Sequence, residues 1–433
     1  MGLATLALAG CGGGGHGSAS KDASATGPVV TRSSARHRPA PSRSQPSSET
    51  LSLQAVLTGV MRQAGPATGA EVYDLTTGTV LYNVRDGVQR PPASVEKLYT
   101  TVAAVRMLGP SARLHTMVLG TGHLDPNGVW EGDLYLKGGG DPTFGDGTFN
   151  KVWELGYGPT ASQLVNQLRA KGIRAVSGTV IGDGSIFDAA RGGPATQFRP
   201  DIPDYGGQLS GLTYDHGANV GAASPEAFAA KQLAATMRAA GIQATAAKLP
   251  GATPRRAHRL AIVSSPPLSV MIDLMNVPSD DLFADMFAKQ LGHRFGDDGS
   301  IAAGAGVISG LLAAYGLHPT ILDGSGLSRD DRSSPRQVVT LLRKVWHTPV
   351  GHVLSGSLPI LGVSGTTHRI GKGTYAQGRC IGKTGTLDNV TNLAGYCHAA
   401  DGHMLTFAIF LDGPTNDQGV QFLTRMMGPI ARY

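Results

Sequence analysis

The chain has 433 residues, more than a single domain usually holds, so its length predicts two folded units and a tail. Only 16% of the residues are charged and Gly and Ala are frequent, which favours a compact folded body over a coiled coil or a disordered chain. The net charge is +6, and much of the excess lies in a Pro- and Ser-rich stretch at residues 32–43 that has no aromatic side chain. We interpret this stretch as a solvated linker rather than an arm that binds nucleic acid.

Residues 1–50 are predicted to be a lipoprotein-like leader followed by a disordered tether. A short apolar run at residues 3–10 ends in Leu-Ala-Gly before Cys11, which resembles the lipobox of bacterial lipoproteins, in which the cysteine is lipidated. The stretch after it is rich in Gly, Ser and Pro and cannot bury a core, so we expect a flexible tether. A leader and a tether predict an extracytoplasmic location, in the periplasm or on the outer face of the membrane. No Lys or Arg precedes Cys11, although export signals normally begin with basic residues. Export without a lipid therefore remains an alternative, as does an apolar segment that has no targeting role.

Beyond the tether the pattern is that of a folded domain. Apolar residues at helical spacing near 53–61 are followed by strand-like segments at 70–75 and 79–84. A helical run then opens at Ser94 and stops at Gly109.

Residues 116–260 differ, because short strand-like segments alternate there with glycine turns, and we predict an inserted, β-rich accessory domain. Helical patterns return after residue 280, and three strand-like segments and a last helix end the chain. The predicted fold is therefore α+β. It is an antiparallel sheet flanked by helices, formed by residues 51–115 and 261–433 and interrupted by the insert.

Three short patterns occur in the order that a serine acyl-transfer site needs. They are Ser94-Val95-Glu96-Lys97, Ser279-Asp280-Asp281 and Lys383-Thr384-Gly385. A serine at a helix start and a lysine one turn later face the same side, so Lys97 can take the proton of Ser94. Lys97 must be neutral to do so, and we expect desolvation and the charge of Lys383 to favour that form.

The other two patterns supply groups that complete such a site. Ser279 is expected to cap a helix and to relay a proton toward the leaving amine. Lys383 is expected on an edge strand, where Gly385 permits close backbone approach. The backbone N–H groups of Ser94 and Thr386 together form a candidate oxyanion hole.

At these residues the chain resembles the D-alanyl-D-alanine carboxypeptidase/endopeptidase family of class C, low-molecular-mass penicillin-binding proteins. The resemblance covers roughly residues 51–427. It is carried by Arg90-Pro91-Pro92-Ala93-Ser94, Gly138-Gly139-Gly140-Asp141-Pro142, Asp323-Gly324-Ser325-Gly326-Leu327-Ser328-Arg329, Leu358-Pro359-Ile360, Gly365-Thr366 and Lys383-Thr384-Gly385-Thr386-Leu387.

The resemblance implies a β-lactamase/transpeptidase-like domain and a serine-type hydrolase that needs no cofactor. It would act on peptidoglycan stem peptides through an acyl-enzyme and would be inhibited by β-lactams. Ser94 would be the acylated nucleophile, Lys97 its base and Ser279 the proton relay. The binders of the terminal D-Ala carboxylate would be Lys383, Thr384 and Thr386, with Asp281 and Gly385 beside them. The stretch 323–329 would be a structured loop near the cleft. The balance of carboxypeptidase and endopeptidase activity, and the oligomeric state, stay open.

One residue departs from the family pattern. The family has Asn at the third position of the middle motif, whereas this chain has Asp281, which only accepts hydrogen bonds when ionised. A carboxylate beside Lys97 favours the charged amine, which cannot accept a proton. We therefore predict slower acylation, or a shifted pH optimum, relative to an Asp281→Asn variant.

Two other readings share these motifs. A serine β-lactamase is one, but the class A route uses a glutamate, and none follows Glu226. A non-catalytic envelope binding protein on the same scaffold is the other, prompted by Asp281.

The 13 histidines show no His-Glu-x-x-His pattern, so no metal is expected. Cys380 and Cys397 would form a disulfide if their segments are arms of a hairpin, and two buried thiols are the alternative.

Overall fold

The computed structural model describes residues 46–202, 206–218, 221 and 224–433, and Pro46–Tyr433 form one compact unit. The candidate lipidation site Cys11 and the tether up to residue 45 lie outside the described residues. The first helix begins at Ser48, inside the predicted tether 1–50, because the Ser47 side chain accepts a hydrogen bond from the Thr50 N–H and caps it.

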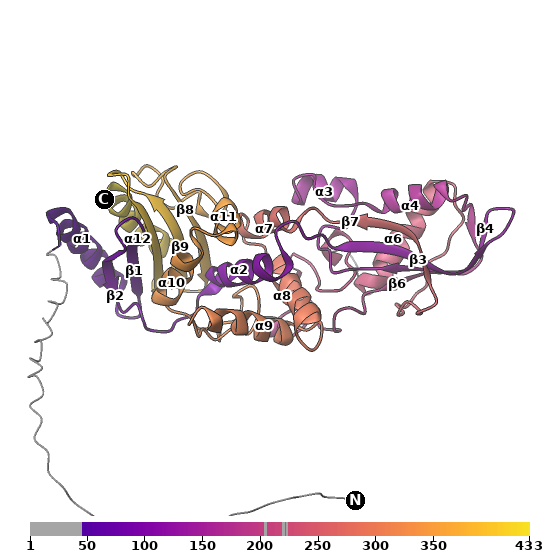
Figure 1. Cartoon of the computed structure of the whole chain (residues 1–433), viewed down its shortest axis with the longest axis horizontal. Helices are drawn as coiled ribbons and strands as arrows, with labels where there is room; N and C mark the ends of the chain where they lie inside the picture. The colour runs from indigo at the N-terminus through magenta and orange to yellow at the C-terminus, as the bar shows by residue number, and fades with distance from the viewer. Residues whose placement is uncertain (1–45, 203–205, 219–220, 222–223) are drawn as a thin grey trace, which may run out of the picture. The chain divides into compact units, whose positions relative to one another are not determined.

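A five-stranded antiparallel sheet joins the two ends of this unit (Figure 1). Its strand order is β2-β1-β10-β9-β8. The strands are β1 (Gly69–Asp74), β2 (Thr79–Val84), β8 (Cys380–Leu387), β9 (Val390–His398) and β10 (Met404–Asp412). Because β1 pairs with β10, residues far apart in sequence share one sheet, and β8 lies at its edge.

Helices cover both faces of this sheet, and the central strand β10 shows how the faces are divided. Phe407 and Ile409 pack in a core with α1 (Ser48–Ala64) and α12 (Asn416–Arg432). Ala408 and Phe410, which alternate with them, pack in a second core with helices of the middle of the chain. This alternation is the period of two expected of a strand that is buried on both sides. The helices of this second core are α2 (Lys97–Leu108), α8 (Asp281–Phe295), α9 (Ile301–Ala314), α10 (Pro335–Val345) and α11 (Pro349–Gly356). Helix α7 (Leu268–Asn276) joins α2 and α8 in a further core.

A second sheet is built from residues 115–264 alone. Its strands are β3 (His115–Leu124), β4 (Val129–Lys137), β5 (Ala175–Val176), β6 (Val180–Asp183) and β7 (His258–Ser264). It is mixed, since β5 and β6 run parallel to β4. Its own core includes residues of α4 (Ala161–Ala170) and α6 (Pro225–Ala239), and α3 (Gly147–Trp153) precedes them.

The predicted α+β fold is confirmed by this architecture. The division into a discontinuous domain and an insert at 116–260 stays a prediction, and the separate sheet and core of residues 115–264 support it. Strand β7 continues to Ser264, past the predicted end of the insert, because Val263 pairs with β3 and is buried in the same core.

Two neighbouring residues of α1 test how that helix is attached. Leu57 is fully buried in the first core, whereas Val56 is 47% exposed. We expect Leu57→Ala to lower the free energy of unfolding by about 2–5 kcal/mol, because it leaves a cavity. We expect Val56→Ala to change that free energy by about 0.5 kcal/mol or less. Equilibrium denaturation of both variants measures the difference, and equal losses would contradict the packing of α1.

Candidate active site

The predicted nucleophile lies on a short, unusual turn. Residues Ala93–Glu96 form a 3-10 helix that precedes α2, so Ser94 lies in this turn and not in the α-helix itself. Ala93 has a φ of 48°, which a residue with a side chain adopts only where its surroundings enforce it. Strand β8 supplies one such neighbour, because a Cβ built on Gly385 would lie 2.4 Å from the Pro92 carbonyl oxygen. Glycine at position 385 is therefore what lets β8 approach the Ser94 turn.

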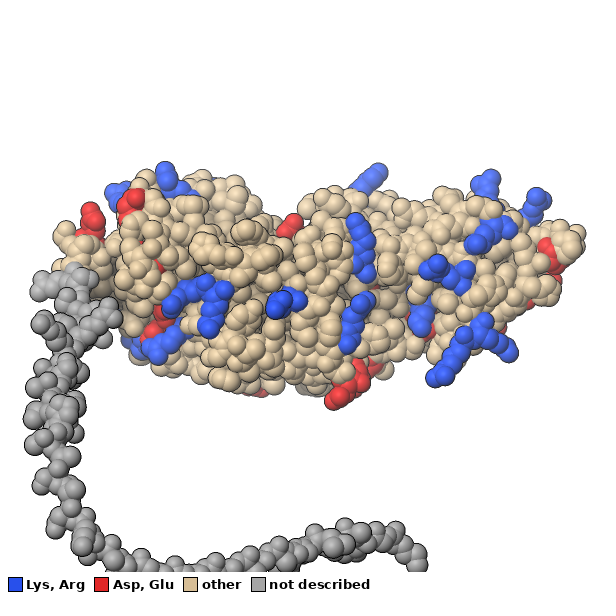
Figure 2. Space-filling view, in the orientation of Figure 1, with Lys and Arg blue, Asp and Glu red and all other residues tan. Residues whose placement is uncertain are grey.

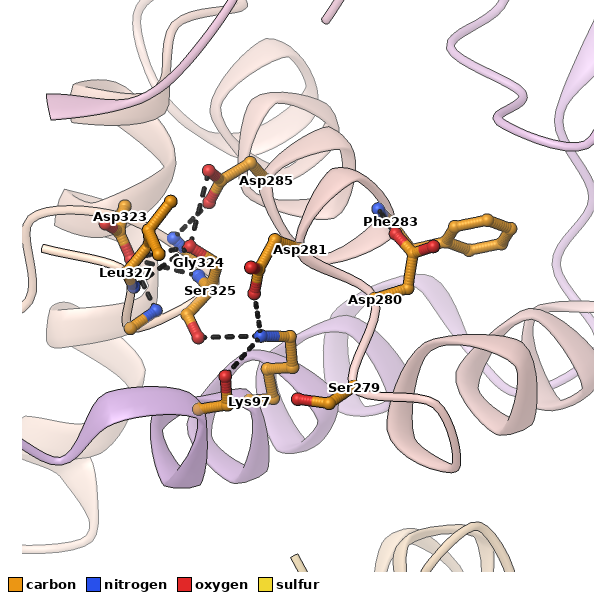
Figure 3. A network of polar contacts seen from close by, with 12 residues as sticks. Lys97, Ser279, Asp280, Asp281, Phe283, Asp285, Asp323, Gly324, Ser325 and Leu327 are labelled. Carbon is orange, nitrogen blue, oxygen red and sulfur yellow. Dashed lines mark hydrogen bonds and ion pairs between the residues drawn. The ribbon is translucent and has the colours of Figure 1, made fainter. Parts of the chain in front are cut away.

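Lys97 is fully buried and contacts three separate parts of the chain. Its Nζ donates to Ser94 Oγ at 3.0 Å and to the Ser325 carbonyl oxygen at 2.8 Å. It also forms an ion pair with Asp281 Oδ1, which Figure 3 shows beside the Ser325 contact. The three hydrogens of the charged amine thus have three acceptors, and this arrangement favours the charged form.

The middle motif is capped by a different residue from the one predicted. The helix α8 begins at Asp281, and its N-cap is Asp280, whose side chain accepts from the Phe283 N–H at 2.9 Å. The prediction that Ser279 caps this helix is therefore wrong. Ser279 instead has a φ of 70°, and its hydroxyl accepts a hydrogen bond from Lys383 Nζ at 2.7 Å. Because the cap is supplied by Asp280, the Ser279 hydroxyl is turned toward the third motif.

Lys383 lies on the edge strand β8, as predicted, and is fully buried. Besides Ser279, its Nζ contacts the Thr384 carbonyl oxygen at 3.1 Å. Burial lowers the pKa of Lys383 well below its usual value, and the charge of Lys97 lowers it further, while Asp281 opposes the shift. The sequence predicted a charged Lys383 that keeps Lys97 neutral. In the structure burial disfavours the positive charge on Lys383, and Lys97 forms an ion pair with Asp281.

The remaining predicted substrate-binding residues follow along β8. The Thr384 hydroxyl donates to the Thr366 hydroxyl at 2.7 Å, which joins β8 to the Gly365-Thr366 segment. Thr386 is exposed, so it is open to a ligand at this edge. Together with the contacts above, these positions bring all three sequence motifs into one site.

Two contributors to this site were not predicted individually. The Ser325 carbonyl that accepts from Lys97 belongs to a tight turn, in which the Asp323 carboxylate accepts from the N–H groups of Ser325, Gly326 and Ser328. The second is Thr366. The Asp-Gly-Ser-Gly run signals the turn, but a backbone acceptor leaves no residue-specific trace in a sequence.

The two cysteines lie directly opposite each other on the hairpin of β8 and β9. Cys380 pairs with Cys397 in the strand register, both are buried, and their sulfur atoms are joined in a disulfide. Of the two alternatives that the sequence left open, the structure has the disulfide.

An antiparallel sheet with a serine, two lysines and a second serine at the junction of its edge strand and α2 defines a serine hydrolase of the penicillin-binding protein class. The chain belongs to the D-Ala-D-Ala carboxypeptidase 3 (S13) family, whose family model matches residues 52–219 and 206–430. The family predicted from the motifs is thereby confirmed, and the protein is a peptidase.

Characterised relatives agree with this assignment. The chain is 29% identical over 383 residues to carboxypeptidase DacB of Mycolicibacterium smegmatis, a match that covers 82% of this chain and 79% of the relative. It is 27% identical over 435 residues to a D-alanyl-D-alanine carboxypeptidase of Actinomadura, with 81% and 78% covered. The crystal structure of penicillin-binding protein 4 from Haemophilus influenzae matches with a TM-score of 0.74 at 20% identity, covering 87% of this chain and 99% of that one. This last likeness shows that the fold is shared.

The ion pair between Lys97 and Asp281 yields a direct test. We expect Asp281→Asn to be acylated by penicillin faster, roughly ten-fold at neutral pH, because the amide no longer favours the charged amine. A hydrogen bond to a charged group contributes about 1.5 kcal/mol or more, and about 1.4 kcal/mol corresponds to a ten-fold change in rate.

Stopped-flow acylation of both proteins across pH measures this effect. Asp388→Asn is the matched control, since it removes an exposed carboxylate from the turn after β8 and should leave the rate unchanged. Equal acylation rates for the wild type and Asp281→Asn at every pH would refute the proposed influence of Asp281.

Proposed function

We propose that the protein is a serine-type D-Ala-D-Ala carboxypeptidase that acts on peptidoglycan stem peptides through an acyl-enzyme at Ser94. The observation that carries the proposal is the set of contacts that brings the three motifs together. Within the first motif, Lys97 Nζ lies 3.0 Å from Ser94 Oγ. The ion pair of Lys97 with Asp281 joins the first motif to the second, and Lys383 Nζ, 2.7 Å from Ser279 Oγ, joins the third motif to the second. A peptidase needs an activated hydroxyl and a second proton carrier in one site, and these contacts supply both.

The proposed reaction begins with the loss of one proton from Lys97, for which the Asp281 carboxylate is the nearest acceptor. Ser94 Oγ then attacks the carbonyl carbon of the peptide bond before the terminal D-Ala, and its proton passes to Lys97 Nζ. The C–N bond breaks, and the leaving amine takes the proton that Lys97 accepted, passed on through the Ser279 hydroxyl. Water then attacks the resulting ester: its OH stays on the shortened peptide, which is released, and its other hydrogen restores the Ser94 hydroxyl. Penicillin would acylate the same oxygen by opening of its β-lactam ring.

Substrate recognition is assigned to the exposed edge of β8. The terminal carboxylate of the peptide would be bound by Thr384, Thr386 and Lys383, with Asp281 and Gly385 lining the same place. Thr386 is exposed and the Thr384 hydroxyl already makes a polar contact, to Thr366, which supports a role for hydroxyl groups. Lys383 is fully buried, so it would contribute to carboxylate binding through its hydrogen bond to Ser279 rather than by direct contact, unless β8 moves to expose it.

The proposed place of action is outside the cytoplasm, where peptidoglycan lies. The disulfide between Cys380 and Cys397 supports an oxidising compartment. A lipid on Cys11 would attach the chain to a membrane, and this remains part of the proposal. None of the helices in the described part of the chain is both long and apolar enough to cross a bilayer.

Nucleic acid is not among the proposed partners. On the face shown in Figure 2, Lys and Arg side chains are spread among neutral areas and do not gather into one stripe. Nucleic-acid-binding domains normally collect such side chains on one face or along one helix. Peptidoglycan peptides and β-lactams therefore stay the proposed partners.

Mass spectrometry of the penicillin-treated protein tests the proposal. We expect one adduct per chain, on the peptide that contains Ser94, because this hydroxyl lies 3.0 Å from Lys97 Nζ at the start of the first motif. Ser94→Ala should lose the adduct. Ser52→Ala, which removes an exposed hydroxyl from α1, should keep it.

Three results would contradict the proposal in different ways. An adduct that persists in Ser94→Ala would assign the nucleophile to another residue. Continuous hydrolysis of nitrocefin would identify a serine β-lactamase. A folded protein that never reacts with penicillin and releases no D-Ala from a stem pentapeptide would be a binding protein.

A further inference from the structure

Glu96, which lies between Ser94 and Lys97 in the sequence, points away from the reactive groups into a buried set of carboxylates. Its partners are Asp323 and Asp331, from the ends of the turn that also supplies the Ser325 carbonyl. Glu96 is 1% exposed and the two aspartates are fully buried. One oxygen atom from each of the three lies within 4.8 Å of the other two.

No ion pair joins this set to a positive side chain among the described residues, although the charge of Lys97 acts on Glu96 and Asp323. Some other buried carboxylates do have a cationic partner. Glu226 pairs with Arg191 at 2.8 Å, and Asp86 pairs with Arg336 at 2.9 Å. By contrast, both carboxylate oxygens of Glu96 and the Oδ2 of Asp331 are buried without a hydrogen-bond partner. Such groups are costly to bury, so a missing cation or missing protons must balance them.

The two aspartates are fixed in place by backbone groups. Asp323 accepts from three N–H groups of its own turn, and Asp331 Oδ1 accepts from the Leu322 N–H at 2.7 Å. These bonds leave Asp331 Oδ2 free, and Glu96 reaches the same place from the other side. The site is therefore built from two distant segments and has an unpartnered side chain aimed into it.

We propose that Glu96, Asp323 and Asp331 bind a hard divalent cation, Ca²⁺ in particular. The three oxygens lie within 4.8 Å of one another, close enough for one ion to contact all of them, and Ca²⁺ takes oxygen ligands at about 2.3–2.6 Å in flexible geometry. Mg²⁺ demands near-ideal octahedral geometry and gives up its water ligands reluctantly, so a buried set of carboxylates suits it less well. Zn²⁺ prefers nitrogen and sulfur ligands, which these three residues do not offer.

The burial of these three carboxylates also indicates that they lack a balancing positive charge. Desolvation, together with the neighbouring charges of Asp323 and Asp285, raises the pKa of Asp331 to about 9. A bound cation would replace the protons that these acids otherwise need. It would also tie the Ser94 turn to the turn that carries the Ser325 acceptor of Lys97, which Figure 3 shows next to Lys97.

The test measures binding itself, so its outcome does not depend on the proposed reaction. Because the site is buried, the full chain is unfolded with its disulfide intact in denaturant and EDTA, then refolded with or without Ca²⁺. We expect about one tightly held calcium per chain by elemental analysis after desalting. The melting temperature should rise by a few degrees with Ca²⁺ and by less with the same concentration of Mg²⁺, because a ligand that binds the folded state stabilises it.

Two variants and one control assign the site. Glu96→Gln and Asp331→Asn should each lose the bound calcium and the shift in melting temperature. Asp331→Asn keeps an oxygen for the Leu322 N–H, so it serves if Glu96→Gln does not fold. Asp330→Asn removes an exposed neighbouring charge and should bind calcium like the wild type.

The proposal is overturned if the refolded wild type retains no calcium and its melting temperature does not respond to Ca²⁺. Equal calcium in the wild type and both cluster variants would also overturn it, because the metal would then lie elsewhere. A larger shift with Mg²⁺ than with Ca²⁺ would contradict the choice of ion.

Discussion

The ion pair between Lys97 and Asp281 is the contact on which the rest of the site depends. A fully buried amine is unfavourable unless its hydrogens are accepted, and here each acceptor comes from a different segment: the Ser94 turn, the first turn of α8 and the Ser325 carbonyl. Satisfying one side chain therefore draws three distant stretches of chain to one point. The same part of the site holds a second buried amine, Lys383, whose pKa is lowered by burial and by the charge of Lys97.

Much of this site could be predicted because each motif is a short stretch of sequence and the motifs follow one another in the expected order. The Ser-x-x-Lys spacing, the acidic start of α8 and the Lys-Thr-Gly edge strand each carry a distinct chemical signature, and their order along the chain predicted that they meet. The near-continuous apolar run of β10 likewise predicted a strand, and both of its faces are buried. The family assignment rested on these motifs together with the further segments that resemble the family, such as residues 138–142 and 323–329.

What could not be predicted depends on contacts between distant segments. Ser279 and Asp280 are both good helix caps, and the choice of Asp280 follows from the bond between Ser279 and Lys383, more than a hundred residues away in sequence. The lowered pKa of Lys383 depends on its burial, which no spacing encodes. Glu96 looks like an ordinary helix-start acid until the structure places it against Asp323 and Asp331.

The pairing of β1 with β10 affects when the enzyme's sheet can form during synthesis. The hairpin of β1 and β2 is synthesised early, whereas β10, which pairs with β1, is synthesised near the end. The sheet is therefore rich in long-range contacts and can be completed only late in synthesis. A chain halted before Cys380 would contain Ser94 and Lys97 yet lack β8, the strand that lies against the Ser94 turn. We therefore expect unfinished or truncated chains to be inactive.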